Sequence, residues 1–148
     1  MLIKEKTERS CKKVLEKGGR GIGAKILWDE LRPGICPLSP ENKLIFTIGP
    51  LTGTKIQSAS RWMVQFKSPL TGTYFRSVGG GFFGAELKFA GYDAIIVEGK
   101  AEKPVYILID DDKVEIRDAS RLWGKFCSET DQLLKDEIGS DIYILRIG

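Results

Sequence analysis

The sequence predicts an α+β fold, in the form of an internally duplicated β-sheet domain with short helices. Alternating or continuously apolar runs predict strands, and apolar residues at helical spacing follow two glycine-rich segments. The segment GGRGIGAKIL from Gly18 is echoed by GGGFFGAELK from Gly79, 61 positions later. We interpret the echo as a duplicated unit of glycine turn, helix and strand, and the alternative is a chance similarity of two helix starts.

Length and charge limit the possible classes of protein. The 148 residues, of which 42% are hydrophobic, suffice for one domain that buries roughly two thirds of its unfolded surface. The 23 basic and 20 acidic side chains are interspersed, so we expect no nucleic-acid partner. No apolar run approaches the ~20 residues of a membrane span, and we expect no membrane partner and a location in the cytoplasm.

Histidine is absent and cysteine is scarce, which removes several kinds of chemistry. Without histidine there is no Ser-His or Cys-His nucleophile pair and no histidine-bound zinc. Cys11, Cys36 and Cys127 are widely spaced, so we expect no disulfide framework and no metal site, and interpret all three as buried small hydrophobic residues. Asn42 is the sole asparagine beside many Lys, Arg and Glu residues, a bias typical of proteins from hot environments.

The first half of the chain contains one predicted helix and one strongly predicted strand. Residues 1–17 are highly charged and predict a leader or an exposed helix. A glycine turn at 18–23 precedes a helix from Ala24 that Pro33-Gly34 ends. Residues 43–48 predict a buried strand, and the GPLTGT that follows from Gly49 is nearly repeated as SPLTGT from Ser68. The two similar turns indicate that the chain leaves two strands in a similar way.

The stretch 58–93 concentrates the candidate functional residues. Trp62, Val64 and Phe66 alternate with polar residues as in a half-buried strand, and a Pro-Leu-Thr-Gly turn leads to a return strand. The run Gly79-Gly80-Gly81 then places bare backbone before a helix, which suits a flat or anionic ligand. A tight hairpin that ends in a helix cap is the alternative interpretation.

The last third predicts a strand, a hairpin, a helix and a final strand. A strand at 93–99 is followed by a hairpin at 104–116, and we interpret Asp110-Asp111-Asp112 as its solvated turn rather than a metal site. Residues 118–124 predict a compact turn anchored by an aromatic residue. A capping box at 128–131 opens a helix that Gly139 ends, and 141–148 have the composition of a strand.

Several of these segments together resemble the tungsten-dependent aldehyde:ferredoxin oxidoreductases, in their N-terminal domain. They are GGRGIGAKILWDEL, LSPENKLIFTIGPLTGT, SASRWMVQFKSPLTG, GGFFGAELKFAGYDAIIVEGKAEKPVYILID and VEIRDASRLWGK. The resemblance covers nearly the whole chain from Gly18 onward, and its long identical runs make it specific. It implies an α+β domain of two similar halves, in agreement with the echo described above.

The resemblance also implies a function and a set of site residues. Enzymes of this family oxidise aldehydes to carboxylic acids and pass electrons to ferredoxin, with a tungsten bis-pterin cofactor, a 4Fe-4S cluster and a magnesium ion that bridges the pterin phosphates. By resemblance, Arg61 lies between pterin and cluster, and the turn Val78-Gly79-Gly80-Gly81 lies against the pterins. Val78 and Gly79 replace the family's asparagine and serine here, which puts contacts made through the amide side chain in doubt.

The resemblance therefore predicts that residues 18–148 are a pterin-facing N-terminal domain, incomplete at both ends relative to the family. The three cysteines match none of the cluster ligands, so we expect the chain alone to be inactive without the remaining domains. The partners implied are the pterin, those domains or a second copy of the chain, and ferredoxin. The alternatives are a non-catalytic binding or assembly module, a remnant of a larger gene, and a phosphate- or nucleotide-binding domain that uses 18–23.

Overall fold

The computed structural model of this chain describes residues 2–3 and 18–147. The chain forms two compact units, Met1–Lys100 and Ala101–Gly148. The predicted leader or exposed helix falls mainly on residues 4–17, which lie outside the described residues, as does Cys11. Each unit is described by itself below.

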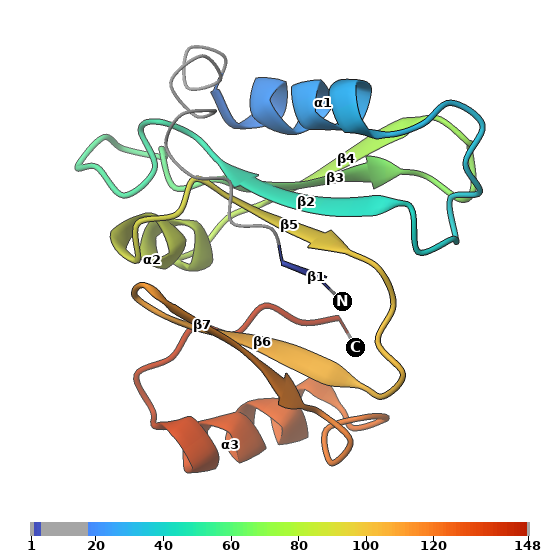
Figure 1. The fold of residues 1–148 in the computed structure, drawn as a ribbon. Helices are drawn as coiled ribbons and strands as arrows, with labels where there is room; N and C mark the ends of the chain where they lie inside the picture. The colour runs from blue at the N-terminus through green and yellow to red at the C-terminus, as the bar shows by residue number, and fades with distance from the viewer. Residues whose placement is uncertain (1, 4–17, 148) are drawn as a thin grey trace. The chain divides into compact units, whose positions relative to one another are not determined.

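The first unit is built on an antiparallel sheet of five strands (Figure 1). In spatial order the strands are β1 (Leu2–Ile3), β5 (Ala94–Glu98), β2 (Lys43–Ile48), β3 (Trp62–Lys67) and β4 (Tyr74–Gly79). The predicted strands that became β2 to β5 are confirmed. Leu2–Ile3, within the region predicted as a leader, instead pair with β5 at the edge of the sheet.

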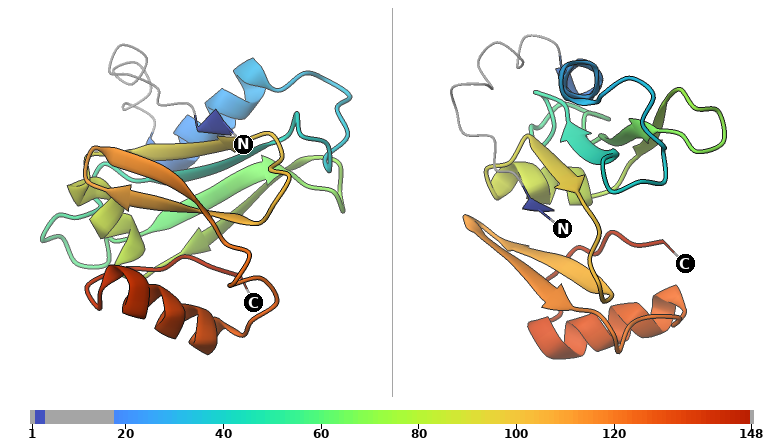
Figure 2. Two further views of the ribbon diagram at one scale, coloured as in Figure 1. Left: turned by 60° about the horizontal axis from the view of Figure 1, so that its bottom comes forward. Right: turned by 45° about the vertical axis from the view of Figure 1, so that its right-hand side comes forward.

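Helix α1 (Gly18–Glu30) covers one face of this sheet (Figures 1 and 2). The predicted glycine turn at 18–23 is wrong, because these residues already belong to the helix. The glycines are needed for close packing: a Cβ on Gly19 would lie 2.8 Å from the Ile48 carbonyl oxygen, and one on Gly23 would lie 2.1 Å from the Gln65 amide nitrogen. No side chain fits in that space, so glycine lets the helix approach the sheet.

The core of the first unit lies between α1 and the sheet. Its buried side chains are Ile22, Ile26 and Leu27 of the helix with Ile45 and Ile96 of the sheet. The strand register places Ile45 beside both Ile96 and Gln65, so all three lie on the face that α1 covers.

A fully buried glutamine sits on this same face of β3. Gln65 donates from Nε2 to the Thr47 hydroxyl at 2.8 Å and to the Gly19 carbonyl at 3.4 Å. Its Oε1 accepts a hydrogen bond of 2.7 Å from the Tyr74 hydroxyl. Burial raises the pKa of Tyr74 above its ordinary value, against the opposing effect of Arg76 and Arg20. The amide thereby ties α1, β2, β3 and β4 together with its own polar atoms satisfied.

Helix α2 (Phe83–Phe89) packs on the opposite face of the sheet (Figures 1 and 2). The Trp62 ring lies between Phe46, at a centroid distance of 6.2 Å, and Phe83, at 5.7 Å. Gly84 of α2 lies close enough that a Cβ there would be 3.4 Å from the Trp62 Cβ. Gly84 thus lies at a helix–sheet contact of ordinary van der Waals distance, unlike Gly23, where a Cβ would overlap the Gln65 amide, and the two glycines occupy different turns of their helices. The duplication itself stays a prediction.

The second unit consists of a hairpin, a helix and the segment that follows it (Figure 2). The hairpin of β6 (Val105–Asp110) and β7 (Lys113–Asp118) confirms the predicted one, and its aspartates are exposed. Helix α3 (Cys127–Ile138) contributes Leu134 to a small core with Ala119 and Leu122. The predicted final strand is wrong: residues 141–147 form no strand, and Ile142 and Ile144 pack on this core instead.

Three smaller predictions for side chains are also wrong. Helix α3 begins at Cys127, before the predicted capping box, and the Glu129 carboxylate accepts the Phe126 N–H at 3.2 Å. Trp123 is 77% exposed and does not anchor its turn, whose buried residues are Ala119 and Leu122. Cys36 is exposed and Cys127 only half-buried, because one lies in a loop and the other in the first turn of a helix.

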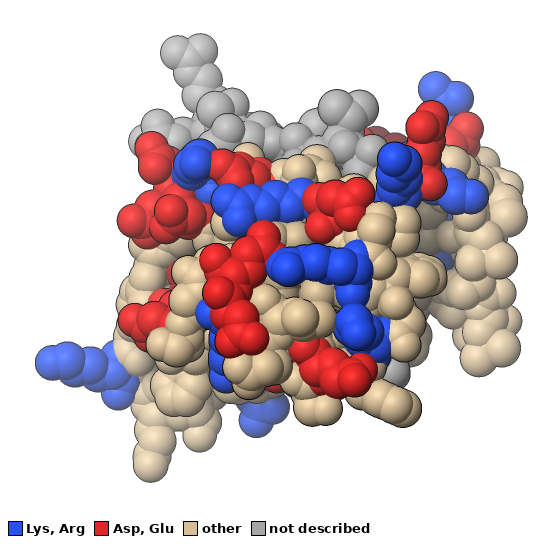
Figure 3. Space-filling model, turned by 90° about the horizontal axis from the view of Figure 1, so that it is seen from below, with Lys and Arg blue, Asp and Glu red and all other residues tan. Residues whose placement is uncertain are grey.

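Charges of both signs are interspersed on the face shown in Figure 3, as the sequence predicts. In the second unit Lys113 and Arg117 both contact the Glu115 carboxylate, at 2.5 and 2.6 Å, and these hydrogen bonds lower the pKa of Glu115. Among the described residues, the structure has no helix with the length and apolar character needed to cross a membrane.

We expect Gly23→Ala to lower the free energy of unfolding by about 1–3 kcal/mol, because the added methyl group must displace a hydrogen-bonded amide. Urea unfolding measures the change. In a Gln65→Ala background the same substitution should cost less, since the obstructing side chain is gone. An equal cost in both backgrounds would show that Gln65 is not the obstacle.

The Tyr74 hydroxyl should make stability depend on alkaline pH. The pKa of Tyr74 in the folded state lies above its ordinary value of 10.0, so its hydrogen bond is fully present below pH 10 and is lost as pH rises through the folded pKa. The free energy of unfolding of wild type should exceed that of Tyr74→Phe by about 1 kcal/mol near neutral pH, and this difference should shrink above pH 10. Urea unfolding from pH 8 to 11.5 tests this, and a constant difference would contradict it.

Candidate functional site

Four element ends meet at one end of the five-stranded sheet. The last residue of β2, Ile48, pairs with Trp62 at the start of β3, and Trp62 pairs with Gly79 at the end of β4. Helix α2 follows the glycine run directly and packs beside Trp62. Figure 1 shows α2 and the loop after β2 at this same end of the sheet. The structure therefore brings Arg61, the residue before Trp62, close to the turn at Gly79–Gly81.

Trp62 fixes the position of the glycine turn. Its Nε1 donates a hydrogen bond of 3.0 Å to the Gly80 carbonyl. The ring lies so close over β4 that a Cβ on Gly79 would be 2.2 Å from two of its carbon atoms. Gly79 is therefore explained by the packing of Trp62, whatever ligand the turn meets.

The other two glycines leave backbone open to the surroundings. A Cβ built on Gly80 or Gly81 would have no neighbouring atom within 4 Å, and Gly81 adopts a φ of +83°. The Ser60 hydroxyl donates to the Gly81 carbonyl at 2.9 Å, so the turn is held from the Arg61 side as well. An exposed and fixed backbone of this kind can accept a ligand that approaches closely.

Arg61 combines a held backbone with an exposed side chain. Its N–H donates to the Ala59 carbonyl at 2.9 Å, and its own carbonyl accepts from the Thr52 hydroxyl at 3.3 Å. The residue is exposed, so its guanidinium is available to an anionic group. The turn and this cation together favour a negatively charged ligand with a flat part.

Val78 has a different orientation from the glycines. It pairs with Met63 in the ladder, so its side chain lies on the face opposite to that of Trp62. It is exposed, and the structure gives it no part in holding the turn.

The residues that hold the site carry no functional signature in the sequence. Thr52, Ser60 and Trp62 supply three hydrogen bonds to the backbone of Arg61 and the glycine turn. The repeated Pro-Leu-Thr-Gly segment draws attention to Thr52 and Thr71, but the repeat does not say which of the two is buried, and the structure shows that it is Thr52.

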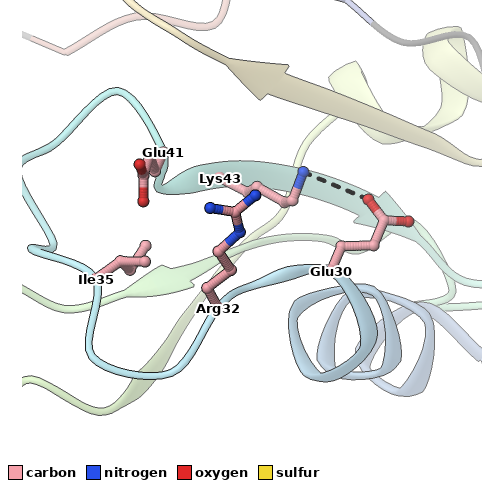
Figure 4. Close-up of a pocket in the computed structure, with 5 residues that line it drawn as sticks. All are labelled: Glu30, Arg32, Ile35, Glu41 and Lys43. Atoms are coloured by element: carbon pink, nitrogen blue, oxygen red, sulfur yellow. Dashed lines mark ion pairs between the residues drawn. The ribbon is translucent and has the colours of Figure 1, made fainter.

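A hollow of about 210 Å³ lies at the opposite end of β2 (Figure 4). Its lining includes Arg32, Glu41 and Ile35, and Lys43 there contacts Glu30 at 3.4 Å and also Glu98. These opposite charges neutralise one another and join α1, β2 and β5. The hollow is separated from the glycine turn by about 17 Å of strand and takes no part in the candidate site.

The described residues contain no group of three or more His, Cys, Asp or Glu side chains placed to hold a metal ion. The candidate site thus consists of a cation and open backbone.

Comparison with known proteins identifies relatives over almost the whole chain. The family model described as aldehyde ferredoxin oxidoreductase, N-terminal domain, matches residues 3–148. The tungsten-containing aldehyde ferredoxin oxidoreductase of Pyrococcus horikoshii is 58% identical, over 99% of this chain and 24% of the relative. The protein of the same name from Thermococcus kodakarensis is 55% identical over the same shares.

A solved structure is similar as well. The active site complex BamBC of benzoyl coenzyme A reductase, in complex with 1,5-dienoyl-CoA, matches with a TM-score of 0.85 and 45% identity. The match covers 93% of this chain and 21% of that chain. The present chain spans about a quarter of the length of the curated relatives that it matches.

The contact of Trp62 with β4 predicts that alanine substitution destabilises the protein at one glycine and hardly changes its stability at the next. Gly79→Ala should lower the free energy of unfolding by about 1–3 kcal/mol, because a methyl group there collides with the indole. Gly80→Ala should change it by less than about 0.5 kcal/mol, since its Cβ enters open space. Thermal unfolding of the two variants measures these values.

Hydrogen exchange of the indole N–H groups provides the local measurement. In wild type and Gly80→Ala, the Trp62 indole should exchange more slowly than those of Trp28 and Trp123, which are exposed. In Gly79→Ala this protection should disappear. Similar exchange of all three indoles in wild type would refute the hydrogen bond to Gly80.

Proposed function

This chain belongs to the aldehyde ferredoxin oxidoreductase family, as its N-terminal domain, and from this premise we propose that it forms one face of the site for a tungsten bis-pterin cofactor. The residues proposed to contact the cofactor are Arg61, Val78, Gly79, Gly80 and Gly81. The observation that carries the proposal is the exposed side chain of Arg61 on a backbone segment whose neighbours Ser60 and Trp62 hydrogen-bond to the open glycine turn.

The chemistry of the cofactor suits these groups. Its thiolates and phosphates are anionic, and an exposed guanidinium on a held backbone offers them charge and directed donors. Its pterin rings are flat, and the absence of side chains at Gly80 and Gly81 lets such a ring approach the main chain. The described residues thus fit one side of the cofactor.

In this proposal the chain's own residues bind the cofactor and orient it. Arg61 attracts the anionic part of the cofactor, and the turn supports the pterin. When bound, the cofactor supplies the two-electron chemistry that oxidises an aldehyde to a carboxylic acid. No residue of this chain is assigned an acid or base role, and we propose that the chain alone does not turn over aldehyde.

The valine at position 78 limits the proposed contacts to the main chain. A valine side chain offers no hydrogen bond to a pterin and no oxygen ligand to a magnesium ion, whereas its main-chain carbonyl can supply either. The Gly80 and Gly81 carbonyls already accept from Trp62 and Ser60. We therefore propose that any contact of Val78 with the cofactor runs through its backbone.

The remaining parts of the active enzyme belong to the longer protein. We propose that a 4Fe-4S cluster, magnesium and the binding site for ferredoxin come with the rest of an oxidoreductase about four times as long. An aldehyde as substrate is supported by the identity of 58% to an aldehyde ferredoxin oxidoreductase, against 43% to the aliphatic sulfonate oxidoreductase, WOR-like subunit, of Pyrococcus furiosus.

The alternatives have less support. The nucleotide-binding hypothesis required a glycine turn at 18–23, and these residues are helical and packed on the sheet. A remnant of a larger gene would expose an unpaired edge at the final strand predicted for 141–148, and residues 141–147 form no strand. A non-catalytic assembly module remains the second candidate, and it predicts that the folded chain binds no pterin.

The experiment uses the pterin cofactor released without oxygen from a purified tungsten aldehyde oxidoreductase. We expect the 148-residue chain to bind it and Arg61→Ala to weaken binding roughly 10- to 100-fold, because a charge-assisted contact is lost. Equilibrium dialysis, with bound pterin measured after oxidation to its fluorescent form, gives the affinity. Arg61→Lys should bind with intermediate affinity.

Arg32→Ala is the matched control, because Arg32 lies at the far hollow and its loss should leave binding unchanged. The same preparations should show no aldehyde oxidation with a viologen dye. A folded wild-type chain that binds no pterin would contradict the proposal and favour the assembly module. An equal loss of pterin affinity in Arg61→Ala and Arg32→Ala would show that charge alone governs binding.

A further inference from the structure

The two Pro-Leu-Thr-Gly turns of this chain have the same sequence but different surroundings. In the turn after β3, Thr71 is exposed, and its hydroxyl contacts the Thr73 hydroxyl at 3.0 Å. In the turn after β2, Thr52 is only 1% exposed. The burial of one threonine and not the other shows that Thr52 has contacts beyond its own turn.

Thr52 holds the backbone on both sides of Ser60. Its hydroxyl accepts the Gly49 N–H at 3.1 Å and donates toward the carbonyls of Ala59 and Arg61, each at 3.3 Å. One hydroxyl thus joins the end of β2 to the segment that leads into β3. This segment returns from a loop in which Ser58 has a φ of 61°.

The methyl group of Thr52 faces helix α2. A Cβ on Gly84 would lie 3.4 Å from the Thr52 methyl carbon and 3.6 Å from the Arg61 carbonyl carbon. The Arg61 backbone is therefore confined between the Thr52 hydroxyl and the start of α2, while its side chain remains exposed.

We propose that Thr52 is a positioning residue for Arg61: it fixes the backbone from which the guanidinium reaches the anionic part of the pterin cofactor. The proposal rests on the cofactor-binding function proposed above. Thr52 does not touch the cofactor, and its effect passes through Arg61. A valine at this position keeps the shape but leaves the Gly49 N–H and two carbonyls without this partner.

Three variants test the proposal by pterin affinity. Thr52→Val should bind the released pterin cofactor roughly five- to tenfold more weakly than wild type, because the position of Arg61 is no longer fixed. Thr52→Ser keeps the hydroxyl and should bind within about twofold of wild type. Thr71→Val removes the same hydroxyl from the exposed turn and should leave affinity unchanged.

A double-mutant cycle with Arg61 separates positioning from general stability. If Thr52 acts through Arg61, Thr52→Val should not weaken binding further in an Arg61→Ala background. Equal fold losses in both backgrounds would overturn the proposal. So would unchanged affinity of the folded Thr52→Val protein with only a lower Tm, which is the result expected of a purely structural residue.

A second measurement distinguishes failure of this proposal from failure of the proposed function. Hydrogen exchange of the backbone amides at 59–62, without any ligand, should be faster in Thr52→Val than in wild type, Thr52→Ser and Thr71→Val. If wild type binds no pterin, the proposed function fails, and this local change alone decides whether Thr52 fixes the Arg61 segment. Unchanged exchange at 59–62 would refute the positioning role.

Discussion

The first unit depends on the close approach of two helices to opposite faces of strand β3. On one face Gly19 and Gly23 bring α1 against the backbone of Ile48 and the amide of Gln65. On the other, Gly84 brings α2 against Trp62. The α1 contact leaves no room for a side chain at Gly19 or Gly23, whereas a Cβ on Gly84 would lie at ordinary van der Waals distance. The spacing of α1 from the sheet is therefore set by its glycine backbone together with the apolar side chains packed between them.

This constraint explains why the candidate site is rigid at its base and open above. Trp62 begins β3 and Arg61 precedes it, and the hydrogen bonds from Thr52, Ser60 and Trp62 hold this segment to the neighbouring turns. The same arrangement leaves Gly80 and Gly81 uncovered. The cofactor proposed above would meet a surface whose backbone is already held by these hydrogen bonds, which would lower the cost of ordering on binding.

Sequence patterns predicted β2 to β7, the part of α1 from Ala24 onward, and the second and third helices, because their apolar residues follow simple spacings; they did not predict β1. They placed the glycines of 18–23 in a turn, since glycine is a poor helix former, and only the packing against Ile48 and Gln65 explains their helical state. The final segment 141–147 has the composition of a strand but finds no strand partner and packs through two isoleucines. Local composition does not indicate whether a segment will find a strand to pair with.

The candidate site was predictable in part. The resemblance to a known family pointed to Arg61 and the glycine turn, and the structure brings them together. The hydroxyls of Thr52 and Ser60 escaped notice because their contacts join residues 7 to 21 positions apart through loops whose path no pattern of spacing predicts. The need for glycine at position 79 was likewise not predictable, because it arises from the Trp62 ring on the adjacent strand.

The contact between Trp62 and Gly79 has a consequence for substitutions at both positions. A large aromatic ring at position 62 can be accommodated only while position 79 has no side chain. The two positions are therefore physically coupled: a side chain at 79 requires the ring at 62 to move, to be smaller, or the strand to shift. The size of residue 62 thus limits which side chains position 79 can hold without rearrangement.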